Sequence, residues 1–394
     1  MNSEGSSTTT SAISCVKCTE GDGSFFRLEN TKLAGYCIKC FPKVIQHKFA
    51  SSLGRNRVFK TAEQRNALLV FTTNKQLESL QLLKLTFKAI SGPEDHRILK
   101  LNAKVLILFE DLIDSVELNK QLNLLKIFLI KQKFYSQWNW RFGHLAAIFN
   151  KFEDFPKEFE RNEGIDGEEN LEKFSNLISN CRSPSVRIEL LRLIRTKLLA
   201  NYAAYFNFPS VLLSENADQL ATETINSLCF GRGSSVFDIS SVIDDRLSPN
   251  SLPFVNHSIQ FIRPLRDISY KELEALDRIE SGENIEENGI NTRINGIIKE
   301  ENSVQSLAKD FIESLRDNGF PATISTILSV SSKIESERNG QICTLCFGRF
   351  QIEEREEIKN KSCLFLLKIC QPCLSIFEDI ENEGINLLQE IDNL

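Results

Sequence analysis

Four Cys-x-x-Cys pairs constrain this chain more than any other feature. Two pairs lie near each end: Cys15 with Cys18 and Cys37 with Cys40, then Cys343 with Cys346 and Cys370 with Cys373. In each half, four thiolates on two tight turns provide the ligand number and geometry of a closed tetrahedral Zn²⁺ site. Eighteen residues separate the first two pairs and 23 separate the second two. We therefore expect two structural zinc ribbons, one toward each end of the fold.

Two other uses of paired cysteines need conditions that this sequence does not favour. A disulfide framework requires an oxidising compartment, but residues 1–14 are rich in Ser and Thr and lack the basic and apolar regions of a secretory signal. A thioredoxin-like redox site requires one pair that opens a helix, not four pairs arranged in twos. We therefore expect reduced thiolates in the cytoplasm. An iron–sulfur cluster on one quartet stays open, because spacing alone does not distinguish it from zinc.

Composition bounds the remaining classes of protein. With 394 residues and 41% hydrophobic content, the chain is long enough to build a substantial core. Its apolar runs are too short to span a bilayer, so we expect no membrane segment. A net charge of −6 does not indicate a nucleic-acid binder as a whole, so any RNA contact must be local.

Between the quartets, short apolar runs alternate with helical patterns. We expect buried strands at residues 67–71, 104–109, 145–149 and 211–213, because each is a short apolar run. Apolar residues recur at helical spacing over 77–90, and residues 186–205 also have a helical pattern. Strands that alternate with helices predict an α/β fold with a doubly wound parallel sheet and right-handed crossovers.

Changes in pattern also predict how the chain is divided. We expect a disordered tail at 1–14, the N-terminal zinc ribbon with a basic segment at 15–60, and the α/β domain at 61–280. An acidic linker at 281–302, a helical segment at 303–335 and the C-terminal zinc ribbon at 336–394 follow. The acidic stretches 153–172 and 277–301 lack a sustained apolar period, which predicts solvated loops or partly disordered insertions.

The loop after the first strand is where a sheet of this kind binds its ligand. It consists of Thr72, Thr73, Asn74, Lys75 and Gln76. A phosphate cradle needs glycines, so that backbone N–H groups approach the anion without a Cβ clash. Because the loop has none, we expect a polar loop that caps a helix and no functional ATP site. Lys75 and the two hydroxyls leave weak nucleotide binding as the alternative.

The most basic stretch of the chain follows the first quartet. Its candidate RNA-binding residues are Lys43, Lys48, Arg55, Arg57 and Lys60. A solvated cationic helix face, with Phe49 and Leu53 packed beneath it, explains the same pattern equally well.

No residue pattern indicates catalytic chemistry. The four histidines stand apart in sequence, and no serine occupies a nucleophile elbow. Cys181 and Cys229 are isolated, which is typical of small buried side chains. Cys363 lies between the last two pairs and is a spare candidate ligand.

Several segments of the chain together resemble one protein family. They are Cys15-Val-Lys-Cys18, Cys37-Ile-Lys-Cys40, Leu53-Gly-Arg-Asn-Arg57, Phe230-Gly-Arg-Gly233, Arg263-Pro-Leu-Arg-Asp267, Gly319-Phe-Pro-Ala-Thr323 and the final cysteine pairs. In content and order they resemble the cytoplasmic tRNA 2-thiolation protein 2 family, and the match spreads over most of the chain. The resemblance implies a PP-loop ATPase-like domain that has lost its active groups.

Three departures from active PP-loop proteins carry that implication. The Ser-Gly-Gly-x-Asp-Ser signature would fall on residues 72–77, where none of it is retained. The Gly-His-Asn-Ala-Asp motif becomes Ser214-Glu-Asn-Ala-Asp218 and keeps only its second half. The cluster-binding Cys-x-x-Cys of active thiolases corresponds to Cys181-Arg-Ser-Pro184, which lacks the second thiolate.

The resemblance implies a non-catalytic subunit for 2-thiolation of the wobble uridine in cytoplasmic tRNAs for lysine, glutamine and glutamate. Its partners would be tRNA and a catalytic, paralogous thiolase that uses ATP and accepts sulfur from a ubiquitin-related carrier. Two alternatives stay open. One is an active ATP-dependent ligase that uses Lys75 and Asp218, and the other is a zinc-ribbon adaptor that binds nucleic acid without any role in thiolation.

Overall fold

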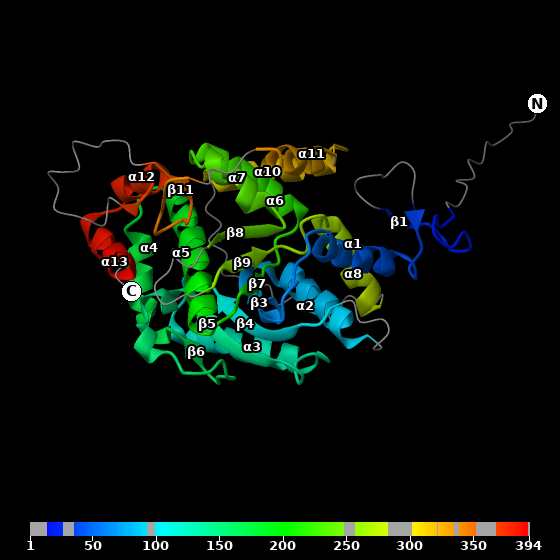
Figure 1. Ribbon diagram of the computed structural model, residues 1–394, viewed down its shortest axis with the longest axis horizontal. Helices are drawn as coiled ribbons and strands as arrows, with labels where there is room; N and C mark the ends of the chain where they lie inside the picture. The colour runs from blue at the N-terminus through cyan, green and yellow to red at the C-terminus, as the bar shows by residue number, and fades with distance from the viewer. Residues whose placement is uncertain are drawn as a thin grey trace, which may run out of the picture.

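The computed structural model describes residues 14–26, 35–92, 99–247, 257–282, 302–320, 322–334, 339–351 and 368–392. A seven-stranded sheet forms its centre (Figure 1). The strand order is β6 (Ile165–Asp166), β5 (Asn139–His144), β4 (Asn102–Phe109), β3 (Asn66–Thr72), β7 (Ser210–Leu212), β9 (Ile259–Ile262) and β8 (Ile243–Leu247). All neighbouring strands are parallel except β8 with β9. The predicted doubly wound parallel sheet is confirmed, with an antiparallel strand added at one edge.

The chain builds this sheet outward from β3 in two directions. Strands β4, β5 and β6 follow on one side, and β7 then pairs with the other side of β3. The loops after β3 and β7 therefore diverge at the carboxyl ends of adjacent strands. That switch point is where open α/β sheets bind ligands.

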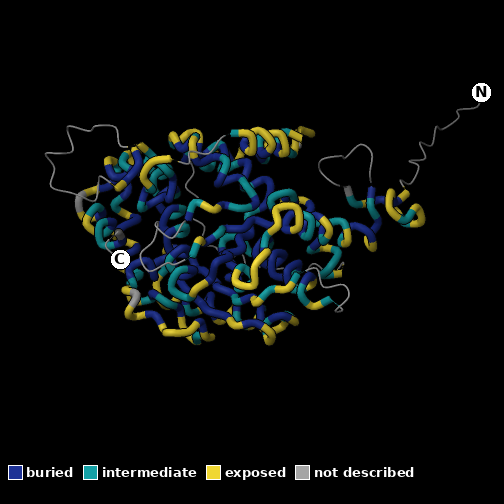
Figure 2. Tube along the Cα trace, viewed as in Figure 1, coloured by how far each residue is buried: buried dark blue, intermediate teal, exposed yellow. Residues whose placement is uncertain are grey.

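The central strands are buried on both faces, as Figure 2 shows. Along β3, Leu68 and Val70 belong to one core, whereas Leu69 and Phe71 belong to the other. This alternation follows from the two-residue period of a strand. Burial on both sides explains why these strands are continuous apolar runs in the sequence.

Helices cover both faces of the sheet and give three layers (Figure 1). The Leu69 face packs against α1 (Phe41–Arg55), α2 (Gln76–Ser91), α3 (Ser115–Ile130) and α8 (Tyr270–Ser281). The Leu68 face packs against α4 (Leu171–Ser179), α5 (Pro184–Tyr205), α12 (Gln371–Asp379) and α13 (Asn382–Asp392). A third cluster joins α6 (Ala217–Cys229), α10 (Val304–Asp317) and α11 (Ala322–Ser331), beside the short α7 (Val236–Ser240).

Local sequence signals explain where several helices begin. α5 starts with Pro184, whose fixed φ and missing N–H suit the first helical position. At the start of α6, the Asn216 side chain accepts from the Gln219 backbone N–H at 3.0 Å, and the Gln219 side chain accepts in return from the Asn216 backbone N–H. Ser269 and Glu272 form the same reciprocal cap on α8.

One predicted strand is wrong. Residues 145–149 form the buried 3₁₀ helix η5 (Leu145–Phe149), and the strand is the preceding β5. A short apolar run fits a buried helical turn as well as a buried strand, so periodicity cannot separate them. The true strand escaped notice because it carries Arg141 and His144, which are buried with hydrogen-bond partners.

The first acidic stretch is more structured than predicted. Within residues 153–172, β6 extends the sheet beside β5, and the 3₁₀ helix η7 (Glu168–Asn170) leads into α4. The Asp166 carboxylate accepts from the Arg141 guanidinium at 2.7 and 2.9 Å and from the Tyr202 hydroxyl at 3.0 Å. These partners offset the charge of the Asp166 carboxylate, so an acidic residue is tolerated in the edge strand β6.

The remaining boundary predictions stay predictions. Residues 1–13 of the tail, 283–301 of the linker and the spare ligand Cys363 lie outside the described residues. In the part of the chain that is described, no helix is both long and apolar enough to span a membrane.

Candidate functional site

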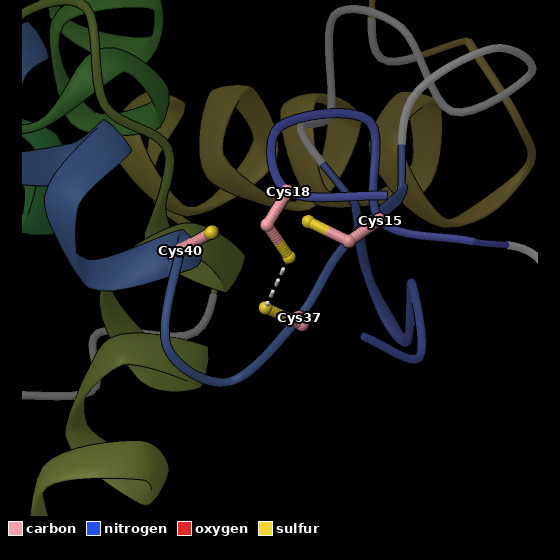
Figure 3. A group of neighbouring side chains, drawn as sticks. All are labelled: Cys15, Cys18, Cys37 and Cys40. Carbon is pink, nitrogen blue, oxygen red and sulfur yellow. Dashed lines mark hydrogen bonds between the residues drawn. The ribbon is translucent and has the colours of Figure 1, made fainter. Parts of the chain in front are cut away.

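The N-terminal quartet brings four sulfur atoms together (Figure 3). Cys15 and Cys18 lie on a turn before β1 (Phe25–Phe26), and Cys37 and Cys40 lie between β2 (Gly35–Tyr36) and α1. The four Sγ atoms lie within 4.8 Å of one another, with Cys18 and Cys37 3.7 Å apart.

The C-terminal quartet repeats this construction. Cys343 and Cys346 lie on the turn between β10 (Gln341–Ile342) and β11 (Arg349–Phe350), and Cys370 caps α12, which contains Cys373. Their Sγ atoms also lie within 4.8 Å of one another, and Cys346 and Cys370 are 3.6 Å apart.

Backbone hydrogen bonds shape both first turns in the same way. The Thr19 N–H donates to the Cys15 oxygen at 2.8 Å, and the Phe347 N–H donates to the Cys343 oxygen at 2.9 Å. A glycine makes room for sulfur in each turn. A Cβ on Gly21 would lie 3.0 Å from the Cys37 Sγ, and a Cβ on Gly348 would lie 3.3 Å from the Cys346 Sγ.

Both donor sets fit one tetrahedral metal ion. Zn–S bonds of about 2.3 Å place tetrahedral sulfurs about 3.8 Å apart, close to the 3.7 and 3.6 Å seen here. This spacing suits a single ion rather than a larger iron–sulfur cluster. The second pair of each quartet also lies at the start of a helix, α1 or α12, where the helix dipole favours thiolates.

The surroundings of Cys346 in the C-terminal quartet favour its thiolate form. Hydrogen bonds from Cys343, Cys370 and Cys373 lower the pKa of Cys346 well below its usual range, and the charge of Arg232 lowers it further. Burial opposes this shift but does not outweigh it. Metals bind thiolates rather than thiols, so this arrangement favours occupancy.

Cys181 belongs to neither quartet. It is 1% exposed, its thiol donates to the Leu177 oxygen at 3.7 Å, and its backbone forms a bridge with Ile380. Within the described residues, the two quartets are the only groups of three or more metal-ligating side chains. In the segment expected to correspond to a cluster-binding motif, Cys181 is therefore packed in the core, whereas the Arg182 side chain is exposed.

The loop at the switch point forms a short 3₁₀ turn, η3 (Thr73–Lys75), followed by α2 from Gln76. Side chains of this loop form hydrogen bonds with other groups of the protein. The Thr73 hydroxyl donates to the Leu108 oxygen at 3.4 Å, and the Asn74 amide donates to the Glu110 carboxylate. The Thr72 N–H donates to Ser79 Oγ at 3.1 Å. The loop is polar and leads into α2, but the predicted cap is not formed, because the N-cap residue Lys75 makes no side-chain capping hydrogen bond.

Ion pairs close this loop on both sides. The Lys75 ammonium lies 3.5 Å from Glu215 Oε1, in the loop after β7. The Glu110 carboxylate, at the end of β4, is bound by the Arg195 guanidinium from α5. Burial works against the charge of Glu215, but Lys75 and then Arg263 and Arg195 lower its pKa below the usual value.

Asp218 belongs to the retained half of the Gly-His-Asn-Ala-Asp motif, and its carboxylate also binds groups within the protein. One carboxylate oxygen accepts from the Tyr270 backbone N–H at 2.8 Å, and the other accepts from the Arg316 guanidinium at 3.2 Å. Asp218 thus ties α6 to α8 and α10. Both residues of the alternative ligase site, Lys75 and Asp218, are engaged in structural ion pairs.

A cavity of about 480 Å³ lies at the carboxyl ends of β4 and β5, where its lining includes Asp111 and His144. Its lining includes five carboxylates, from Asp111, Asp114, Glu168, Glu169 and Glu172. Burial, and then the charge of Glu110, raises the pKa of Asp111 to about 6. Burial lowers the pKa of His144 to about 4, so this histidine is neutral at pH 7 and adds no positive charge. The cavity therefore repels phosphate.

The predicted RNA-binding residues divide into two groups. Lys43, Arg57 and Lys60 are exposed on α1 and the turn after it, and Arg55 is exposed but bound to Asp267 at 3.3 Å. Lys48 differs, because it is 9% exposed and its ammonium donates to Glu272 at 3.0 and 3.2 Å. A buried, paired ammonium cannot reach phosphate. The expectation for Lys48 is therefore corrected, and its role is to hold α1 against α8.

Sequence reasoning missed two basic residues at the N-terminal quartet. Lys17 and Lys39 are exposed at the tips of the two Cys-x-x-Cys turns, each beside an exposed aliphatic residue, Val16 or Ile38. Their position between paired cysteines is the signal that should have revealed them, since the two middle residues of such a turn face away from the metal.

Known proteins resemble this chain along most of its length, although no protein-family model matches it. It is 31% identical to cytoplasmic tRNA 2-thiolation protein 2 of Caenorhabditis elegans over 333 residues, which cover 84% of this chain and 87% of the relative. It is 28% identical to the Caenorhabditis briggsae protein of the same name over 361 residues, 89% of this chain and 93% of that one.

A solved structure matches the fold. The U34-tRNA thiolase NcsA from Methanococcus maripaludis, with its [4Fe-4S] cluster, superposes with a TM-score of 0.51 at 14% identity, over 93% of this chain and 96% of that one. This agreement supports the doubly wound α/β fold expected from the sequence. The sequence similarity to the worm proteins shows that this chain belongs to the cytoplasmic tRNA 2-thiolation protein 2 family.

Proposed function

We propose that this chain is a non-catalytic subunit for 2-thiolation of the wobble uridine in cytoplasmic tRNAs for lysine, glutamine and glutamate. It binds tRNA and a catalytic thiolase. That partner activates the uridine with ATP and accepts sulfur from a ubiquitin-related carrier. The names of the relatives support the process, and the closed switch-point loop supports the non-catalytic role.

The observation that carries this proposal is the pairing of Lys75 with Glu215 and of Glu110 with Arg195. A nucleotide phosphate at this position would have to separate Lys75 from its carboxylate and approach two acidic side chains. It would also meet Cβ atoms where a glycine-rich loop leaves open backbone N–H groups. Each of these features disfavours ATP.

The experiment compares Lys75→Ala with Lys84→Ala in the full chain, co-expressed with the catalytic thiolase. The two lysines are similarly buried, at 22% and 19% exposure, and both are paired, but Lys84 binds Asp277 away from the loop. We expect both variants to support the same level of 2-thiouridine in tRNA. A specific loss with Lys75→Ala, together with ATP hydrolysis by the isolated chain, would instead establish an active ligase.

We also propose that both quartets hold structural Zn²⁺ and that the N-terminal one belongs to the tRNA-binding end. The basic side chains near it, Lys43, Arg57 and Lys60, are exposed. Neutralising these three should weaken tRNA binding at low salt and reduce the dependence of log K on log salt by about one unit per lost phosphate contact. An unchanged slope would remove this region from the tRNA surface and favour the solvated-helix interpretation.

A further inference from the structure

The segment Phe230-Gly-Arg-Gly233 has no role in the functions discussed so far. It forms the turn between α6 and the 3₁₀ helix η8 (Gly233–Ser235), and Gly231 adopts a φ of +71° there. A Cβ on Gly231 would lie 3.7 Å from Pro372, within the last cysteine pair. The turn therefore packs directly against the C-terminal quartet.

Arg232 points from this turn into the quartet. Its side chain is 3% exposed, and one terminal nitrogen donates to the Cys373 Sγ at 3.3 Å. The other terminal nitrogen donates to Glu189 Oε1, on α5, at 2.5 Å. Glu189 is also bound by Arg192 at 2.6 Å, which fixes the carboxylate that orients Arg232.

The charge of a metal-loaded quartet explains why a cation is needed at this position. A divalent ion with four thiolates carries a net charge of about −2. All four cysteines are 7% exposed or less and lie within the apolar cluster on the Leu68 face. Burying such an anion without a counter-charge is costly.

We propose that Arg232 is the positioning residue of the C-terminal metal centre: its guanidinium, held by Glu189, orients the Cys373 thiolate and offsets the charge of the four-thiolate ion. This rests on a metal in that quartet and not on the role in tRNA thiolation. Within the described residues, the thiols of Cys15, Cys37 and Cys40 are hydrogen-bonded by backbone groups or by other cysteines, and by no arginine or lysine side chain. That quartet is therefore an internal control.

The test measures metal release from the full, Zn²⁺-loaded chain by a competing chelator. In Arg232→Gln we expect the affinity of the C-terminal quartet to fall about 10- to 100-fold, as for other outer-shell partners of metal ligands. Repeating the measurement in a Cys15→Ser background, in which only the C-terminal quartet is intact, identifies which quartet releases its ion. In Arg232→Gln with both quartets intact, the ion of the N-terminal quartet should be released as in wild type. Arg232→Lys keeps the positive charge but loses the two-pronged guanidinium, so its metal affinity should lie between those of wild type and Arg232→Gln.

Arg141→Gln is the matched control, because Arg141 is also a buried arginine, 5% exposed and paired with Asp166 at 2.7 Å, but binds no cysteine. It should lower stability without changing metal affinity. If Arg232→Gln does not fold, Arg232→Lys and Glu189→Gln carry the same test. Wild-type affinity of the C-terminal quartet in a folded Arg232 variant, or an equal loss in Arg141→Gln, would overturn the proposal.

Discussion

The two cysteine quartets share the Cys-x-x-Cys spacing of their pairs, a backbone hydrogen bond in the first turn and a glycine beside a sulfur, yet they lie in opposite environments. At the N-terminal quartet, the tips of the turns carry Val16 and Ile38 at 54% and 53% exposure. At the C-terminal quartet, the apolar residue of the first turn is Leu345, which corresponds to the exposed Lys17 and is itself only 4% exposed. The same motif thus forms a surface-exposed site near the N-terminus and a buried site near the C-terminus.

Their neighbours explain the difference. The N-terminal sulfurs form a small separate cluster, whereas the C-terminal sulfurs belong to the large core that includes β3, β4 and α5. The N-terminal segment projects from the body of the protein beside α1 (Figure 1). A metal in the core stabilises the fold itself, and a metal in the projecting segment shapes a surface.

Removal of the C-terminal metal should have the largest effect. In Cys370→Ser, the ion is lost and the core beneath α12 is left with unpaired, partly charged thiols, so we expect the free energy of unfolding to fall by more than about 4 kcal/mol. Urea denaturation of the zinc-loaded chain measures this change.

The matched substitution at the other end is Cys37→Ser. Because α1 is anchored by its own buried residues, Phe41, Ile45 and Phe49, the main unfolding transition should shift by less than about 1 kcal/mol. Equal shifts for the two serine variants would show that both quartets belong to one cooperative unit and that the N-terminal quartet is not energetically separate from the core.

The next effect concerns the packing of α1, which follows the N-terminal quartet, against α8. Lys48→Met leaves Glu272 buried without its ammonium partner, which should cost about 3 kcal/mol. Lys43→Met, on the exposed side of the same helix, should change stability by less than about 0.5 kcal/mol. Thermal or urea unfolding of the two variants distinguishes an anchor from a surface charge, and similar values would contradict the assignment of Lys48.

Residue spacing predicted both quartets and most of the sheet, because ligand number and continuous apolar runs are local properties. It could not predict burial. Lys48 and Lys43 look alike in the sequence, and only Glu272, 224 residues away, makes one of them internal. The sulfur partner of Arg232, Cys373, is 141 residues away, because the turn after α6 and the last cysteine pair meet only in the folded protein. Pairs between residues far apart in the chain therefore cannot be predicted from a single sequence.

A smaller effect on stability, but a clear one on binding, is expected at the tips of the N-terminal turns. Replacing Lys17, Lys39 and Lys43 together by glutamine should leave stability within about 0.5 kcal/mol. The salt dependence of tRNA affinity should fall by up to about three units if each contacts a phosphate. The control replaces three exposed lysines elsewhere, Lys120, Lys131 and Lys309, and should leave the slope unchanged. A similar loss in both triples would show that only net charge matters.

The smallest effect is expected for the exposed pair of Arg55 with Asp267. Arg55 is 70% exposed and its guanidinium lies 3.3 Å from the carboxylate, so water and salt screen the attraction. A double-mutant cycle with Arg55→Gln and Asp267→Asn should give a coupling energy below about 1 kcal/mol. The same substitution at Arg232, buried against a thiolate and a carboxylate, has no solvent to replace its partners. If the Arg55 pair coupled as strongly as a buried one, the N-terminal region would be held by its charges, and they would not be available to tRNA.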